Sequence, residues 1–167
     1  VPAEYSLSVW TVVKAGTDAG VVVVAAAGNG NQNLDGSAYT AYRNRGDSGA
    51  ILVGAGSATS AHNKLSFSTY GSRVNVQGWG ESVFTLGYGN FAQYGGDQNQ
   101  KYTQFFSGTS SATPIVAATI LNLQSYIVQS TGQPYTSVQM RNLLISTGIP
   151  QGSGGHIGPF INLKTAI

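Results

Sequence analysis

The sequence has no cysteine, only two histidines and few charged residues. The lack of cysteine excludes a disulfide framework and thiolate metal sites. Charged residues make up 8% of the 167 residues and the net charge is +2, whereas an average domain has about 25% charged residues. The basic residues do not cluster, so nucleic acid is not expected as a partner. No uninterrupted apolar run reaches the roughly 18 residues of a membrane span, so no membrane partner is expected either.

In place of charges the chain is rich in glycine, with 23 residues, and in Ser, Thr, Asn and Gln. A chain of this length is sufficient for one domain with a core of its own. A polar but weakly charged surface is common among secreted proteins, so we expect a secreted, extracellular protein.

Apolar runs and helical patterns alternate along the chain, which is typical of an α/β fold. The unbroken run Val21–Ala27 predicts a buried strand of a parallel sheet, and residues 50–56 predict a second. Further strands are expected around Leu65–Phe67 and at 73–77. Residues 84–103 show no clear period and predict a long loop or hairpin.

Three helices are expected between these segments. Residues 4–19 repeat apolar side chains at helical spacing, with Val9, Val12 and Val13 on one face and Gly20 as a stop. A second helix is predicted over about 110–130. A third is predicted over about 137–147, where Thr136 and Gln139 can form a capping box. The remaining segments are a loop at 148–159 and a short tail at 160–167.

The start of the second helix carries the strongest chemical signal. Ser110 follows the turn residue Gly108 and stands at or near the helix N-terminus, where unpaired N–H groups and the helix dipole favour negative charge. Pro114 is expected in the first turn, where its missing N–H is harmless. This position suits a nucleophile, because negative charge develops beside it in the transition state. A serine that merely caps a helix is the plainer interpretation of these residues alone.

The longer string Gly-Thr-Ser-Ser-Ala-Thr-Pro at residues 108–114 is more specific. It resembles the nucleophile motif of the subtilisin-like serine proteases (subtilases), and on that match the nucleophile is Ser110. The apolar run that ends in Ala-Ala-Gly-Asn at Asn29 also resembles the family, in which this asparagine donates a hydrogen bond to the oxyanion. A plain turn asparagine is the alternative. The resemblance further implies a set of substrate-binding residues: Ala26, Ala27, Gly28 and Thr109.

The resemblance covers nearly the whole chain. It implies an α/β, subtilisin-like fold with a mainly parallel sheet flanked by helices, of which residues 1–167 form the C-terminal part of one catalytic domain. It also implies a serine endopeptidase that acts on protein or peptide substrates and requires no cofactor.

The catalytic Asp and His of the family belong before the oxyanion asparagine, Asn29. In that region the chain has only Glu4 and Asp18 as acids, and no histidine. We therefore expect this fragment alone to be inactive or nearly so. We also expect a companion N-terminal chain that carries the Asp and the His.

Other interpretations stay open beside this one. Asp47, His62 and Ser110 follow one another in the order of a catalytic triad, but both partners come after Asn29 and no Gly-Thr follows His62, so we reject this set. A catalytically dead subtilase-like binding or structural module would keep the fold without the base. An unrelated serine hydrolase is disfavoured by the motif spacing.

Two weaker signals concern the loops. Asp35, Asp47 and Asp97 lie among Asn residues and carbonyl groups, as calcium ligands can, so a structural calcium is possible, although solvated loop acids are the simpler alternative. The tripeptide Arg45-Gly46-Asp47 matches an adhesion motif that also occurs by chance.

Overall fold

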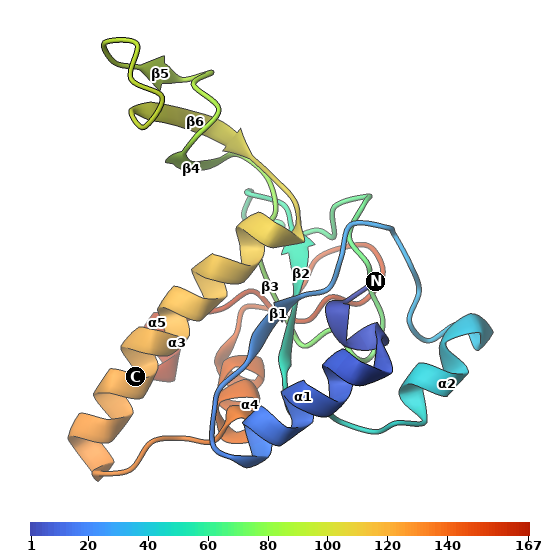
Figure 1. The fold of residues 1–167 in the computed structure, drawn as a ribbon. Coiled ribbons are helices and arrows are strands. Elements are labelled where there is room, and N and C mark those ends of the chain that lie inside the picture. Colours follow the sequence, from blue (N-terminus) through green and yellow to red (C-terminus); the bar gives the residue numbers. More distant parts are fainter.

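A three-stranded parallel sheet lies at the centre of the computed structural model, which describes residues 1–167 (Figure 1). In order across the sheet, its strands are β1 (Val24–Ala26), β2 (Ile51–Gly56) and β3 (Val76–Trp79). The strands of a second, antiparallel sheet, in the order β4-β6-β5, are β4 (Val83–Leu86), β5 (Ala92–Gln93) and β6 (Lys101–Phe106). The α-helices are α1 (Leu7–Asp18), α2 (Thr40–Arg43), α3 (Thr109–Thr131), α4 (Ser137–Thr147) and α5 (Leu163–Ala166). Two short 3-10 turns are η1 (Ala3–Tyr5) and η2 (Ser37–Tyr39).

The parallel sheet separates two apolar cores. On one face α3 packs against all three strands, and the larger core joins side chains of the sheet, α3 and α4. Its buried members include Ile51, Val53, Val76, Val116, Ile120, Leu123, Met140 and Leu144. The smaller core contains Ala27, Leu34, Tyr42, Val74 and Ile157, with Trp10 of α1 packed against it. β2 is buried along its whole length, because it has a strand on either side and a core on each face.

The helix α3 is long and apolar enough, by length and composition alone, to cross a membrane. The core helix of a globular domain passes the same test. Here one side of α3 packs against the sheet, which accounts for its apolar composition.

Several predicted elements are confirmed. β2 and α4 lie where the sequence predicts them, and α3 begins one residue before Ser110. The capping box is present: the Gln139 N–H donates to the Thr136 hydroxyl (3.3 Å), and the Thr136 N–H donates to the Gln139 side-chain oxygen (2.9 Å).

Two strand predictions need correction at the edges of the sheet. β1 covers only three residues of the predicted run Val21–Ala27, because Val24 already pairs with Ile51, the first residue of β2, and the chain turns at Gly28 (φ 98°). The predicted strand at 73–77 begins later, at Val76. The reason is Asn75, whose side-chain oxygen accepts the Leu52 N–H (2.8 Å) in place of a backbone carbonyl.

Two further predictions are corrected by local geometry, and one is confirmed. Leu65–Phe67 forms no strand, since a single bridge at Lys64 is followed by a turn. The segment 84–103, predicted as a long loop or hairpin, is confirmed as a hairpin: it contains most of β4, all of β5 and half of β6, which pair antiparallel. Pro114 lies in the second turn of α3 rather than the first, so it leaves the carbonyl of Ser110 without its usual helical donor.

The predicted apolar face of α1 is only partly covered. No residue of α1 is buried, and Val12 is 72% exposed. On α3, Leu121 is 73% exposed, and β1 leaves one backbone edge unpaired. Exposed apolar helix faces beside an open strand edge mark a surface on which another protein segment can pack.

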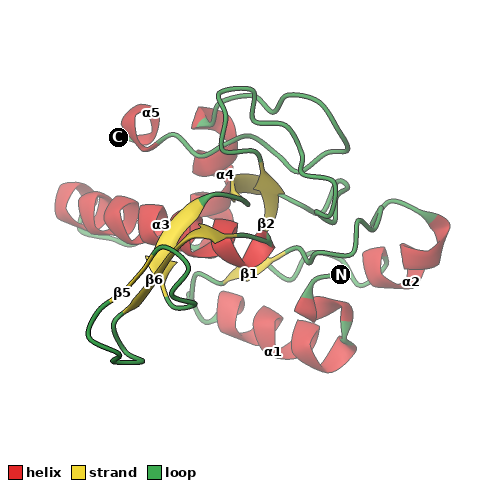
Figure 2. Ribbon diagram, turned by 90° about the horizontal axis from the view of Figure 1, so that it is seen from above, coloured by secondary structure: helices red, strands yellow, loops and turns green.

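The antiparallel sheet forms an arm, residues 83–106, that stands clear of the rest of the molecule (Figures 1 and 2). Its strands contact one another extensively, and its side chains join neither core. The last strand of the arm, β6, leads through Ser107 and Gly108 directly into α3.

A buried carboxylate ties the N-terminal segment to the sheet. Glu4 is 2% exposed and accepts hydrogen bonds from the hydroxyls of Tyr42 and Ser48. The Arg73 guanidinium lies 2.9 Å from the same carboxylate. Burial and the hydrogen bond to Glu4 raise the pKa of Tyr42, which therefore stays a proton donor to Glu4.

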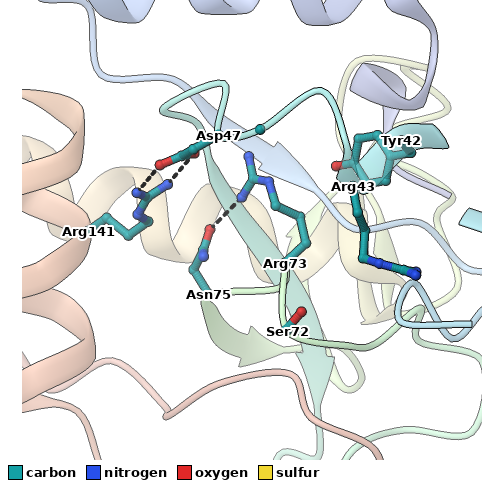
Figure 3. A pocket seen from close by; sticks show the side chains of 8 residues that line it. Tyr42, Arg43, Asp47, Ser72, Arg73, Asn75 and Arg141 are labelled. Atoms are coloured by element: carbon teal, nitrogen blue, oxygen red, sulfur yellow. Dashed lines mark hydrogen bonds and ion pairs between the residues drawn. The ribbon is translucent and has the colours of Figure 1, made fainter. Parts of the chain in front are cut away.

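Beside this cluster a polar cavity of about 340 Å³ opens to the surface (Figure 3). Arg141 of α4 forms a two-point ion pair with Asp47 at its rim, and the Arg73 guanidinium donates to Asn75 (3.0 Å). The side chain of Arg43, which also lines the cavity, donates to the carbonyls of Leu34 and Gly36. The three arginines are thus bound by protein acceptors.

Removal of the Arg73 charge should destabilise the fold. We expect Arg73→Met to lower the free energy of unfolding by about 3 kcal/mol, because the buried Glu4 carboxylate loses its cation. The matched control is Lys14→Met, which breaks the solvent-exposed ion pair with Asp18 and should cost less than about 0.5 kcal/mol. Urea denaturation followed by circular dichroism measures both, and similar small effects for the two variants would contradict this role of Arg73.

The Asp47–Arg141 pair should make the fold sensitive to acid. The hydrogen bonds from Arg141 lower the pKa of Asp47 to about 2, below the unfolded value of about 3.9. The pair therefore stabilises the fold above about pH 4, and this contribution is lost as the pH falls toward about 2. We expect the melting temperature of Asp47→Asn to fall less than that of the wild type between these pH values, and parallel curves would refute the assignment.

Candidate active site

The nucleophile candidate Ser110 is the second residue of α3 and is exposed. Gly108 precedes the helix with φ 109°, a conformation that favours glycine. The Ser110 N–H has no acceptor in the chain, as expected in the first turn of a helix. Its hydroxyl also makes no hydrogen bond within the protein. Ser110 therefore presents a free hydroxyl and a free N–H at the positive end of a long helix.

The loop after β1 brings Asn29 to the same place. The Asn29 side-chain oxygen accepts two hydrogen bonds from Thr109, from the N–H (2.8 Å) and from the hydroxyl (2.9 Å). The Thr109 hydroxyl in turn accepts the Gly28 N–H (3.2 Å). The loop and the helix start are thus locked together one residue from Ser110.

This bonding fixes which way the Asn29 amide points. Because its oxygen is held by Thr109, its NH₂ group is left without a protein acceptor and is free to donate. A Cβ atom at Gly108 would lie 3.1 Å from that nitrogen, so glycine keeps the space beside the amide open. The site therefore combines a nucleophile with two hydrogen-bond donors, the Asn29 amide and the Ser110 N–H. Such donors can stabilise an oxyanion.

A general base is absent from this site. The imidazole of His62 stacks on the ring of Phe160 with centroids 4.5 Å apart, and the carboxylate of Asp47 is paired with Arg141. Neither side chain makes a hydrogen bond with Ser110. The rejection of Asp47, His62 and Ser110 as a triad agrees with this arrangement.

The four residues predicted to bind substrate differ in accessibility. Ala27 is 0% and Thr109 1% exposed, so their side chains cannot touch a substrate here, and Thr109 instead positions Asn29. Both backbone groups of Gly28 are used, the N–H by Thr109 and the carbonyl by the Thr69 N–H (2.9 Å). Ala26 is half-buried at the end of β1 and stays a predicted contact.

Ser111, to which the sequence assigned no role, also fixes the helix start. Its hydroxyl lies within hydrogen-bond distance of the carbonyls of Trp79 (3.0 Å) and Gly108 (2.9 Å). This role of Ser111 could have been predicted from the sequence, because serine in the first turn of a helix often forms hydrogen bonds to nearby backbone groups.

The aspartates suggested as calcium ligands do not gather at one site. Asp35 accepts from Ser72, Asp47 from Arg141 and Asp97 from the Asn99 N–H, and no three carboxylate or histidine side chains converge. The cation of Arg141 makes Asp47 a poor calcium ligand, and calcium at the other two stays a prediction.

Comparison with known proteins gives the family. The model described as the subtilase family matches residues 1–158. The chain is 33% identical to subtilisin from Bacillus pumilus over 163 residues, which cover 96% of this chain and 52% of that protein. It is 29% identical to the subtilisin-like serine protease AsES from Sarocladium strictum over 155 residues, 89% of this chain and 34% of that one. The chain thus spans about half the length, or less, of these relatives.

Solved structures share the fold. A cold-adapted subtilisin-like serine proteinase superimposes with a TM-score of 0.66 at 24% identity, over 96% of this chain and 51% of that one. The patellamide maturation protease PatA superimposes with a TM-score of 0.67 at 22% identity, over 94% of this chain and 54% of that one. The parallel sheet with helices on both faces is therefore the subtilisin-like α/β fold predicted from the sequence, and the chain belongs to the subtilase family.

Proposed function

We propose that this chain supplies the nucleophile and the oxyanion donors of a serine endopeptidase. The observation that carries the proposal is the pair of hydrogen bonds from Thr109 to the Asn29 oxygen. They leave the Asn29 NH₂ and the Ser110 N–H free beside an exposed serine hydroxyl at a helix N-terminus. A catalytically dead binding module would have no chemical need for this combination.

In the proposed reaction, Ser110 Oγ attacks the carbonyl carbon of a peptide bond while its proton passes to a histidine base. The carbonyl oxygen becomes an oxyanion that accepts hydrogen bonds from Asn29 and from the Ser110 N–H. Collapse of the tetrahedral intermediate expels the amine, which takes the proton from the histidine, and water then hydrolyses the acyl-enzyme. The histidine and its aspartate partner come from outside this chain.

A companion segment is proposed to bring these two residues. The support for it is the free edge of β1 and the uncovered apolar faces of α1 and α3, with Val12 and Leu121 each more than 70% exposed. A parallel strand added at β1 would extend the sheet, and the rest of the companion segment would pack on those faces. The weakly charged, polar composition supports an extracellular setting as part of the proposal.

Covalent labelling with a fluorophosphonate tests the function. We expect the intact parent protein to be labelled at Ser110, and Ser110→Ala to abolish the label, because only an activated serine reacts quickly. Residues 1–167 alone should show little or no labelling, since they lack the base. Mass spectrometry of tryptic peptides locates the adduct, and rapid labelling of residues 1–167 alone would mean that a base within this chain was missed.

Loss of the Asn29 amide should reduce turnover without preventing binding. We expect Asn29→Leu in the parent protein to lower kcat by about 10²–10³-fold with little change in KM, the range found when one such donor is removed from a subtilisin. Asn33→Leu, in the following loop, serves as the control. Steady-state kinetics on a chromogenic peptide measure both, and an unchanged kcat in Asn29→Leu would exclude Asn29 from the oxyanion site.

A further inference from the structure

A second cavity, of about 210 Å³, lies where the arm joins the nucleophile helix. We call it the arm groove, and its lining residues are Tyr88, Asn90, Thr103, Phe105, Phe106 and Ser107. None of them is charged and three are aromatic. The groove therefore offers apolar surface with a few hydrogen-bonding groups, the usual lining of a ligand site.

The two faces of the arm have different roles. Leu86 pairs with Tyr102 and Thr85 with Thr103, so side-chain alternation puts Tyr102 on the face opposite to Thr103 and the groove. On the Tyr102 face the arm packs its own aromatic rings. Phe84 lies 5.2 Å from Phe91 and 6.1 Å from Tyr102 between ring centroids. That cluster stabilises the arm, and the residues that line the groove take no part in it.

The rim of the groove is held in an exposed position. Tyr88 is 74% and Phe105 59% exposed, and neither joins a core of the body. Tyr88 has φ 60° and stands between Gly87 (φ 108°) and Gly89 (φ 83°). A tyrosine rarely adopts this left-handed conformation without a reason. The turn thus projects an aromatic ring into solvent at the edge of the groove.

The groove lies within reach of a substrate held at Ser110. Ser107, which lines it, precedes Ser110 by three residues, so their Cα atoms are at most about 11 Å apart. An extended peptide advances about 3.3 Å per residue. A side chain two or three residues from the bond under attack can therefore reach the groove.

We propose that the arm groove binds one aliphatic or aromatic side chain of the peptide substrate, two or three residues from the scissile bond. Tyr88 and Phe105 are then specificity-determining residues, and the inference rests on the proposed peptidase function. The uncharged lining offers no counter-charge to Lys, Arg, Asp or Glu. The volume of the cavity, about 210 Å³, is enough for one large side chain. A stable dimer of this chain would instead bury roughly 800 Å² of surface on each partner, so we assign the groove to a substrate side chain.

The test compares peptides in the intact parent protein. Each internally quenched peptide carries Leu or Ser at one varied position, which lies two or three residues from the cleaved bond. The series of peptides covers these positions on both sides of the bond. At one of these positions the wild type should show a kcat/KM about tenfold higher for Leu than for Ser. In the double variant Tyr88→Ser/Phe105→Ser, kcat/KM should be similar for the Leu and the Ser peptide, so that the preference is lost.

The matched control is Leu86→Ser, since Leu86 is 67% exposed on the opposite face of the same arm, and it should keep the preference. A preference that survives in the double variant, or is absent from the wild type, would overturn the groove assignment alone. Failure of the parent to cleave any peptide would overturn the proposed function as well. A wild-type dimer that the double variant converts to a monomer would reassign the groove to self-association.

Discussion

The hydrogen bonds between Thr109 and the Asn29 side chain are the contacts on which the proposed chemistry depends. They join residues 80 positions apart in the chain and set the orientation of a primary amide that could otherwise rotate. Because Thr109 is buried and its hydroxyl also accepts the Gly28 N–H, the geometry is fixed before any substrate arrives. Preorganised donors of this kind need no reorganisation when charge develops, which is the source of their catalytic effect.

The fold supports this contact from both sides. β2 is buried between two strands and two cores, and both β1 and α3 pack against it. The carboxyl end of β1 and the start of α3 then meet at one edge of the sheet, where ligands bind in open α/β sheets. The same architecture leaves β1 with one free edge and leaves parts of α1 and α3 exposed. The strand with the free edge, β1, thus leads directly to Asn29 of the candidate site.

Much of this could be predicted from the sequence because it depends on local patterns. The unbroken apolar run of β2, the Thr136–Gln139 capping box and the helix start at Ser110 each follow from residues close together in the chain. The nearness of Asn29 to Ser110 does not follow from such patterns, and its prediction came from two strings that resemble one family.

The predictions that failed depend on contacts distant in sequence. β1 is short because its pairing starts only at the first residue of β2, and β3 starts late because the Asn75 side chain replaces a carbonyl. The arm was predicted as a loop or hairpin without defined strands, because a register shift interrupts the β4–β6 pairing and leaves no regular alternation in the sequence. Burial of Thr109 and Ala27 likewise could not be inferred, because it depends on how α3 and the β1 loop meet.

The crystal structure of the intact parent protein inhibited by a peptide phosphonate is the most direct measurement of the central claim. The account predicts a covalent bond from phosphorus to Ser110 Oγ. It also predicts one phosphonyl oxygen within about 2.7–3.1 Å of both the Asn29 amide nitrogen and the Ser110 backbone nitrogen. An adduct on another residue, or an oxygen that faces away from Asn29, would contradict it.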